Sequence, residues 1–263
     1  MERTFQLILG YDGTAYAGWQ VQLNQRTIQG ELERAVEELV GVRVPIVGSG
    51  RTDAGVHALA QSASLDLNRW RDDAASLGRA LNTKLPVDIS VLRSEEVPFG
   101  FHALRDATGK RYRYQIQIGG VRDPFEYRYL WHVHGALNVE SMCDAASYLL
   151  GTHDFACFQA TGSERKTTVR TIRDLALTKG EGRGGQGRLT IEVEADGFLY
   201  NMVRNIVGSL VEVGRGNYSP EWMLKLVEGR DRNQAGPTAP PQGLFLIRVD
   251  YPPSPKSLQS TII

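Results

Sequence analysis

The strand and helix patterns of this chain occur in one order, and that order recurs along the sequence. Apolar or alternating segments predict strands, and apolar residues at helical spacing behind a capping residue predict helices. In the first part, strands are predicted at residues 5–11, 42–47, 59–67 and 88–94, and helices at residues 28–40 and 74–82. This β-α-β-β-α-β order is typical of ferredoxin-like α+β folds.

A second part of the chain repeats this order loosely. Strands are predicted at residues 111–118, 171–178, 188–195 and 244–250, and helices at residues 139–150, 198–213 and 219–228. We therefore expect an α+β protein made of two ferredoxin-like halves, residues 1–105 and 106–263. Their antiparallel sheets are expected to pack together and to leave a central cleft.

The charges of the chain balance but are unevenly placed. The 30 Lys and Arg residues equal the 30 Asp and Glu residues, which argues against a protein that coats polyanions in general. Basic residues nevertheless gather in two short segments, residues 105–113 and 165–173. They are compatible with a basic groove for a nucleic acid recognised by its shape, or with ordinary solvated faces.

The sequence also bears on the compartment. No run of about 18 apolar residues occurs, so no membrane span is expected. The residues from Met1 to Thr4 lead into a predicted strand without a secretory signal pattern. Two cysteines are too few for a disulfide framework, and Cys143 is expected to be a reduced thiol on the buried face of its helix. These features predict a cytoplasmic protein.

The segment GSGRTDAGVHA at residues 48–58 has the composition of a reactive loop. Its glycines allow positive φ angles and close approach of a ligand. Asp53 lies two residues after Arg51, so its carboxylate can stay ionised and accessible, as a nucleophile or a general base requires. A tight turn capped by Asp53 is the structural alternative.

Arg204 lies in FLYNMVRNIVGSLVEVG, a segment that is apolar on nearly every side. Such a helix is buried, and a buried guanidinium needs an anionic partner. We expect that partner to be Asp53. The alternative is a narrow exposed stripe that Arg204 shares with Asn201 and Gly208.

Tyr112 belongs to an alternating strand, on the same face as Tyr114 and opposite Arg111 and Arg113. Periodicity alone favours a core position, and the functional alternative is a platform on which an extruded base stacks. The five histidines form no recognised metal motif, and the glycine spacing matches neither a dinucleotide-binding loop nor a P-loop.

Nine motifs resemble those of the tRNA pseudouridine synthases that modify the anticodon arm, and they occur in the order of that family. They are YDGTAYAGWQ (11–20), TIQGELERA (27–35), GRTDAGVHA (50–58), FHA (101–103), KRYRY (110–114), HDFACF (153–158), KTTVRTI (166–172), MVRNIVGSL (202–210) and GLFL (243–246). The resemblance implies that the protein isomerises uridine to pseudouridine at tRNA positions 38, 39 and 40.

The resemblance also implies roles for particular residues. Asp53 matches the catalytic aspartate, Arg204 the arginine that pairs with it, Tyr112 the stacking ring and Arg51 a loop residue that holds the extruded nucleotide. Further substrate contacts are expected from Thr52, His57 and Leu244, and RNA contacts from Arg111, Arg113, Arg165, Lys166 and Arg170. The resemblance implies no cofactor and no metal. It also implies a homodimer that binds tRNA across both subunits.

Some questions stay open at this point. Leu104 stands where many members of that family have arginine after FHA, which affects one local contact. Asp53 can add to C1′ of the ribose, add to C6 of the base, or take the C2′ proton. A catalytically silent RNA-binding module is an alternative function, and so is a nucleoside hydrolase, although a glycosidase usually needs a second carboxylic acid.

Overall fold

A computed structural model describes residues 3–160, 162 and 167–253. Its strands are β1 (Thr4–Tyr11), β2 (Val47–Gly48), β3 (His57–Asp66), β4 (Ile89–Val97), β5 (Gly109–Ile118), β6 (Trp131–Val133), β7 (Gly151–Asp154), β8 (Val169–Glu181), β9 (Gly187–Ala195) and β10 (Leu244–Asp250). Its α-helices are α1 (Ile28–Val40), α2 (Ala74–Asn82), α3 (Val139–Ser147), α4 (Met202–Gly214) and α5 (Trp222–Gly229). The α+β class predicted from the sequence is confirmed.

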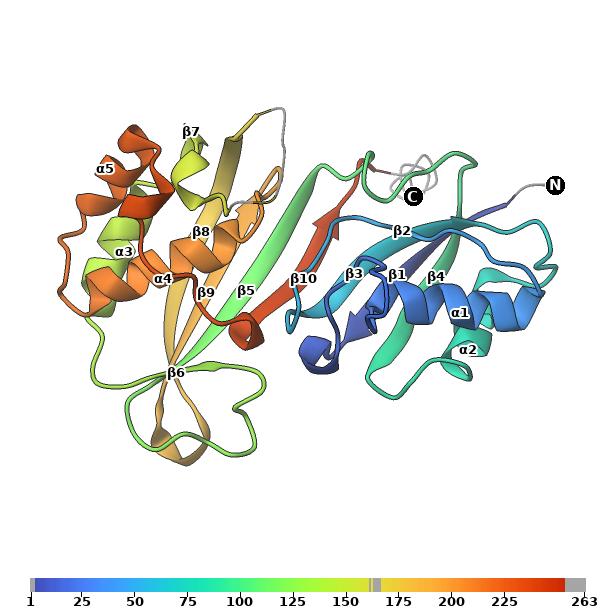
Figure 1. Cartoon of the computed structure of the whole chain (residues 1–263), viewed down its shortest axis with the longest axis horizontal. Coiled ribbons are helices and arrows are strands. Elements are labelled where there is room, and N and C mark those ends of the chain that lie inside the picture. Colours follow the sequence, from blue (N-terminus) through green and yellow to red (C-terminus); the bar gives the residue numbers. More distant parts are fainter. Residues whose placement is uncertain (1–2, 161, 163–166, 254–263) are drawn as a thin grey trace, which may run out of the picture.

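The ten strands formed by the described residues belong to one continuous, mostly antiparallel sheet. The main order is β4-β1-β3-β10-β5-β9-β8-β7, with β2 paired to β3 and β6 paired to β5. Strand β10 lies in the middle, parallel to β3 and antiparallel to β5 (Figure 1). The expected pair of sheets is therefore a single sheet, because the last strand of the chain hydrogen-bonds to both halves. The ferredoxin-like plan of each half remains a prediction.

The helices lie where local capping signals place them. The hydroxyl of Thr27 accepts from the backbone N–H of Gly30 to begin α1, and Gly41 ends it at a φ of 74°. The carboxylate of Asp73 begins α2 in the same way. Helices α1 and α2 lie beside strands β1–β4, and α3, α4 and α5 lie beside β7–β9 (Figure 1).

Several boundaries differ from the sequence prediction. Of the predicted strand 42–47 only Val47 is in a strand, because β2 pairs with β3 at Val47 and Gly48 alone. Helix α4 begins at Met202 rather than at residue 198, because Asn201 has a left-handed φ of 59°. The short strand β7 was not predicted, since four residues carry little periodic signal.

The core follows the alternation of β5 closely. Tyr112, Tyr114 and Ile116 are buried on the side that faces α4 and its neighbours, while Arg111 and Arg113 lie on the opposite face. One thiol prediction was wrong: Cys143 is exposed and only Cys157 is buried, because the inward face of α3 is formed by its neighbours Met142, Ala145 and Ala146.

Candidate active site

The loop that carries Asp53 is anchored to the N-terminal half. The backbone N–H of Trp19 donates to the Thr52 carbonyl at 3.0 Å, and the Tyr11 hydroxyl lies 2.8 Å from Thr52 Oγ1. After Asp53 the chain turns through Gly55 at a φ of 76°, a left-handed conformation that suits glycine. The buried side chain of Thr52 thus holds the loop in place, which leaves Asp53 next to it free to face the other half.

Asp53 and Arg204 meet across the centre of the molecule. Arg204 Nη1 lies 3.3 Å from Asp53 Oδ2, so the ion pair expected from the sequence is present. The same guanidinium donates to Asn201 Oδ1 at 2.8 Å and to the Ala239 carbonyl at 2.7 Å. Both partners are mostly buried, with side-chain exposures of 15% for Arg204 and 20% for Asp53. Arg204 is therefore held in place by Asn201 and Ala239 of the C-terminal half, in addition to its contact with the Asp53 carboxylate.

Two opposing effects set the charge of Asp53. Burial raises its pKa, and the nearby Arg204 guanidinium lowers it without cancelling the effect of burial. The carboxyl group is therefore harder to ionise than an ordinary aspartate, even with its cation in place. A carboxylate in this setting is a stronger base than one in water.

Tyr112 lies near the same carboxylate. Tyr112 is 8% exposed, and its ring meets that of Phe198 edge-to-face, with 5.1 Å between the ring centres. On the neighbouring strand β10, Leu246 stands opposite Tyr112. Burial raises the pKa of the Tyr112 hydroxyl, and the charge of Asp53 adds to the shift. Leu244 is buried two residues before Leu246, opposite Tyr114. The structure therefore brings Asp53, Tyr112 and Arg204 together, although Tyr112 is largely covered.

The other loop residues lie in contrasting settings. Arg51 is exposed, and a Cβ placed on the preceding Gly50 would lie 3.2 Å from Lys110 Nζ, so this end of the loop is basic. His57 is 1% exposed, its Nδ1 accepts from the Gly13 N–H at 3.1 Å, and its Nε2 lies 2.9 Å from the Arg128 carbonyl. Burial lowers the pKa of His57 more than the neighbouring Asp12 raises it. The neutral ring braces the loop and is closed to solvent.

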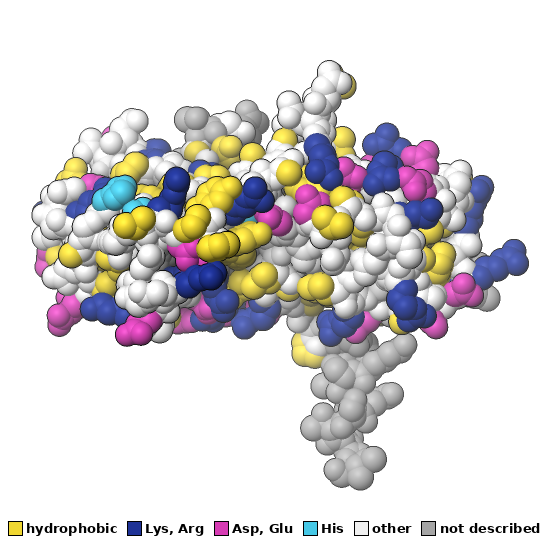
Figure 2. Space-filling view, turned by 90° about the horizontal axis from the view of Figure 1, so that it is seen from below, with side chains coloured by type: hydrophobic (Ala, Val, Ile, Leu, Met, Phe, Trp, Pro, Cys, Tyr) yellow, Lys and Arg dark blue, Asp and Glu magenta, His cyan; other side chains and the backbone are white. Residues whose placement is uncertain are grey.

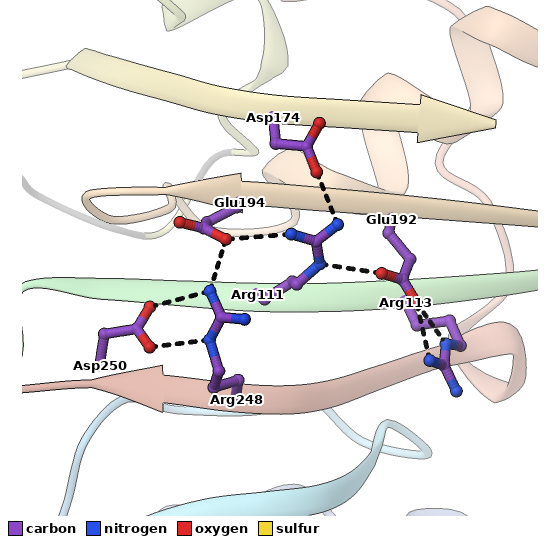
Figure 3. Close-up of polar contacts among 7 residues, drawn as sticks. All are labelled: Arg111, Arg113, Asp174, Glu192, Glu194, Arg248 and Asp250. Atoms are coloured by element: carbon purple, nitrogen blue, oxygen red, sulfur yellow. Dashed lines mark hydrogen bonds and ion pairs between the residues drawn. The ribbon is translucent and has the colours of Figure 1, made fainter.

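The expected RNA-binding arginines of β5 are neutralised by acidic neighbours. Arg111 bonds to Asp174, Glu192 and Glu194 at 2.6 to 3.0 Å, and Arg113 shares Glu192 with it (Figure 3). Because they lie on the face of β5 opposite Tyr112, the structure does not bring them into the Asp53 site.

The second basic segment includes Arg165 and Lys166, which lie outside the described residues. Arg170 is on β8, where its Nη1 donates to the Thr167 and Val169 carbonyls. Its predicted contact with RNA stays a prediction.

Asn201 and Ala239 are site residues that the sequence did not reveal as such. Asn201, which has a left-handed φ, accepts from Arg204 through its side-chain Oδ1, and Ala239 accepts through its backbone carbonyl oxygen. The motif MVRNIVGSL starts one residue after Asn201, and a backbone acceptor leaves no trace in a sequence. The side chain of Asn201 could have been noticed only as the possible cap of the helix.

The described part of the chain contains neither a metal-binding cluster nor a membrane-spanning helix. Within residues 3–160, 162 and 167–253, no cluster of three or more His, Cys, Asp or Glu side chains has a metal-binding arrangement. Over the same ranges, no helix has the length and apolar character needed to span a membrane.

Comparisons with known proteins identify the family of this chain. The model of the tRNA pseudouridine synthase family matches residues 8–104 and 145–252. Proteins named tRNA pseudouridine synthase A from Thermoanaerobacter sp. (strain X514) and Acetivibrio thermocellus are each 45% identical, over 95% of this chain and 100% of their own length. A relative of the same name from Geobacter sp. (strain M21) is 44% identical over 95% of this chain and 99% of its own length.

A crystal structure of a Cbf5-Nop10-Gar1 complex matches with a TM-score of 0.33 and 12% identity over 80% of this chain and 54% of that one, which is too distant to carry an argument. The family match, in contrast, covers most of the chain, including Asp53 and Arg204, and the relatives align over nearly their full length. The chain belongs to the tRNA pseudouridine synthase family.

Proposed function

We propose that this chain converts uridine to pseudouridine in the anticodon arm of tRNA, at positions 38, 39 and 40, with Asp53 as the reactive carboxylate. The contact between Asp53 and Arg204 carries this proposal. It supplies one carboxylate that is shielded from water, faces a cation and stands beside an aromatic ring, and these groups suit chemistry on a single extruded base.

The reaction exchanges one glycosidic bond for another. The bond from N1 to C1′ breaks, the uracil turns, and C5 bonds to C1′; the C5 proton leaves and N1 gains a proton. Asp53 can add to C1′, add to C6, or take the C2′ proton, and each route requires the ionised carboxylate. Arg204 serves all three routes because a nearby cation favours ionisation of Asp53.

Substrate binding must overcome the cost of extruding the uridine from its stack, about a few kcal/mol. We assign the stacking of the extruded base to Tyr112 and the contact with its phosphate to Arg51. Since Tyr112 is 8% exposed, the base reaches it only after a small opening at Phe198, its edge-to-face partner. We also assign substrate contacts to Thr52, next to Asp53 in the loop, and to Leu244.

The setting of the enzyme is also a proposal. We infer a homodimer in the cytoplasm that binds one tRNA across both subunits, without cofactor or metal. The family resemblance supports each of these statements. The proposal does not use Arg111 and Arg113, because acidic neighbours already pair with them.

The decisive experiment compares Asp53→Asn with the wild type on tRNA, with chemical mapping of pseudouridine. We expect turnover to be abolished while the Kd for tRNA changes by less than about tenfold, or 1.4 kcal/mol. Asp72→Asn, at an exposed aspartate before α2, is the matched control and should keep full activity. Retention of a tenth of wild-type turnover by Asp53→Asn would contradict the proposed role, and release of free uracil would indicate a hydrolase.

A further inference from the structure

The segment between β5 and β6 and the β8–β9 hairpin expose a group of aromatic and arginine side chains. We call it the aromatic–arginine patch, and its members are Phe125, Tyr127, Tyr129, Arg122, Arg128 and Arg183. Phe125 is 71% exposed and Tyr127 is 43% exposed. Seen from below, hydrophobic side chains gather among Lys and Arg side chains on this face (Figure 2). This segment lies between the two stretches that match the family model.

Within the patch, arginine side chains lie next to aromatic rings. The Arg183 guanidinium lies 4.5 Å from the centre of the Phe125 ring. Those of Arg122 and Arg128 lie 5.8 Å and 5.6 Å from the centre of the Tyr127 ring. Cations next to aromatic rings form a surface on which bases stack while phosphates find positive charge.

The backbone under the patch is held in place. Gln117 Nε2 donates to the Val121 carbonyl at 2.8 Å, and Gln186 Nε2 of the hairpin donates to the same carbonyl at 2.9 Å. The buried Asp123 accepts from the Phe125 N–H at 2.7 Å. A surface ordered before binding loses less entropy when a ligand arrives.

A cavity of about 340 Å³ opens beside the patch, within the usual size range of small-ligand sites. It is lined by Arg122, Tyr127, Leu130, Trp131, His132 and His134, together with Pro240 and Gln242 from the segment before β10. The lining thus combines four aromatic rings with one guanidinium, which suits a planar base attached to a phosphate.

The cavity and the Asp53 loop share a wall. Pro240 and Gln242 flank Pro241 in the short 3₁₀ helix Pro241–Gly243, and a Cβ placed on Gly55 would lie 3.0 Å from Pro241. On the other side, the Tyr129 hydroxyl donates to Asp12 at 2.9 Å, and its ring lies 5.3 Å from that of His57. An RNA strand whose target base reaches Asp53 therefore passes close to the patch.

We propose that the cavity and the aromatic–arginine patch bind an unpaired nucleotide of the substrate RNA next to the target uridine. Its base enters the cavity against Tyr127, and the arginines contact the flanking phosphates. This inference rests on the proposed function. A second copy of the chain is the competing occupant, but a two-fold contact would set Arg122, Arg128 and Arg183 against the same arginines. Of the acidic residues near the patch, Glu126 is already paired with Arg188 at 2.5 Å, Asp12 accepts from the Tyr129 hydroxyl, and Asp123 is buried.

The test uses the full chain and an RNA hairpin with the sequence of an anticodon arm that the enzyme modifies. An abasic nucleotide is placed at each loop position other than the target in turn. Wild type should bind one of these hairpins about tenfold more weakly. Tyr127→Ala should bind the unaltered hairpin about tenfold more weakly than the wild type does. Its affinity for that abasic hairpin should be no lower than its affinity for the unaltered hairpin.

Two control variants make the result specific. Tyr127→Phe keeps the ring and should restore binding. Tyr218→Ala removes a tyrosine of similar exposure, 46%, near the start of α5, and should bind as the wild type does. Circular dichroism checks the folding of each variant, and sedimentation gives the oligomeric state.

Three results would overturn the inference. They are a Kd of Tyr127→Ala within twofold of the wild-type value, equal sensitivity of both proteins to every abasic hairpin, or a change of oligomeric state with unchanged RNA affinity. If the wild type binds the hairpins but converts no uridine, the proposed function fails while the binding comparison still decides the role of the patch.

Discussion

Arg204 gives Asp53 one hydrogen bond, not two. Its Nη1 lies 3.3 Å from Asp53 Oδ2, whereas its shorter contacts, at 2.7 and 2.8 Å, go to the Ala239 carbonyl and to Asn201. The guanidinium is thus anchored by α4 and the loop before β10, and one edge of it is presented to the carboxylate. Such an arrangement favours the ionised form of Asp53 and leaves its second carboxylate oxygen, Oδ1, available for the reaction.

Replacing Arg204 should change the pH dependence of the reaction. In Arg204→Met, the burial of Asp53 is no longer opposed by a cation, so the pKa of Asp53 rises further. Single-turnover rates at neutral pH should fall by an order of magnitude or more and recover as pH rises. Arg204→Lys should be intermediate, because lysine keeps the charge but cannot hold both Asn201 and Ala239. A profile for Arg204→Met parallel to the wild type would show that Arg204 does not act on Asp53.

Asp53 should cost the folded protein stability once it ionises. Because burial raises its pKa above the ordinary 3.8, the folded state holds this proton more tightly than the unfolded state. The contribution of Asp53 to stability is therefore largest at low pH and is lost as pH rises through the raised value. Asp53→Asn should melt above the wild type at neutral pH, and the difference should vanish below the ordinary pKa. Calorimetric scans across this range measure it; a lower melting temperature for Asp53→Asn at neutral pH would contradict the sign.

Gly208 should be intolerant of a side chain. A Cβ at this position would lie 1.7 Å from the Pro237 carbonyl oxygen. This oxygen belongs to the backbone, so it can move only if the surrounding chain moves with it. Gly208→Ala should lower stability by about 1–3 kcal/mol and displace the loop whose Ala239 carbonyl holds Arg204. Urea unfolding and single-turnover rates report the two effects. Gly229→Ala, where nothing lies within 4 Å of the new Cβ, is the control and should change neither.

Arg111 should matter for stability rather than for RNA. It bonds to three carboxylates with a side chain that is 19% exposed, so Arg111→Gln should destabilise the protein by about 2 kcal/mol. Its Kd for tRNA should stay within about twofold of the wild-type value. Urea unfolding and filter binding measure the two quantities. Binding weakened tenfold in a folded Arg111→Gln protein would mean that RNA contacts this face of β5.

The affinity for tRNA should fall steeply with salt although the net charge is zero, because local arginines and lysines displace phosphate counterions. A log–log slope of roughly −0.7 to −0.9 for each neutralised phosphate is expected. Replacing Arg165, Lys166 and Arg170 together should flatten the slope. A slope near zero for the wild type would count against a basic groove.

Local signals in the sequence were sufficient for most elements of the fold. The bounds of α1, α2 and β10 agree with the prediction, and so does the alternation of Tyr112 and Arg111 on β5. These features depend on caps and on periodicity, which act within a few residues of one another. The order and content of the nine motifs likewise indicated the family that the comparisons confirm.

By itself, then, the sequence determined most of the elements, the family and the identity of the reactive aspartate candidate. The tertiary structure decided that β10 joins both halves into one sheet and that Asp53 meets Arg204 across 151 residues of chain. It also decided that carboxylates on β8 and β9 neutralise Arg111. These outcomes depend on strand pairing and burial between distant segments, whose free energies no local window of sequence contains.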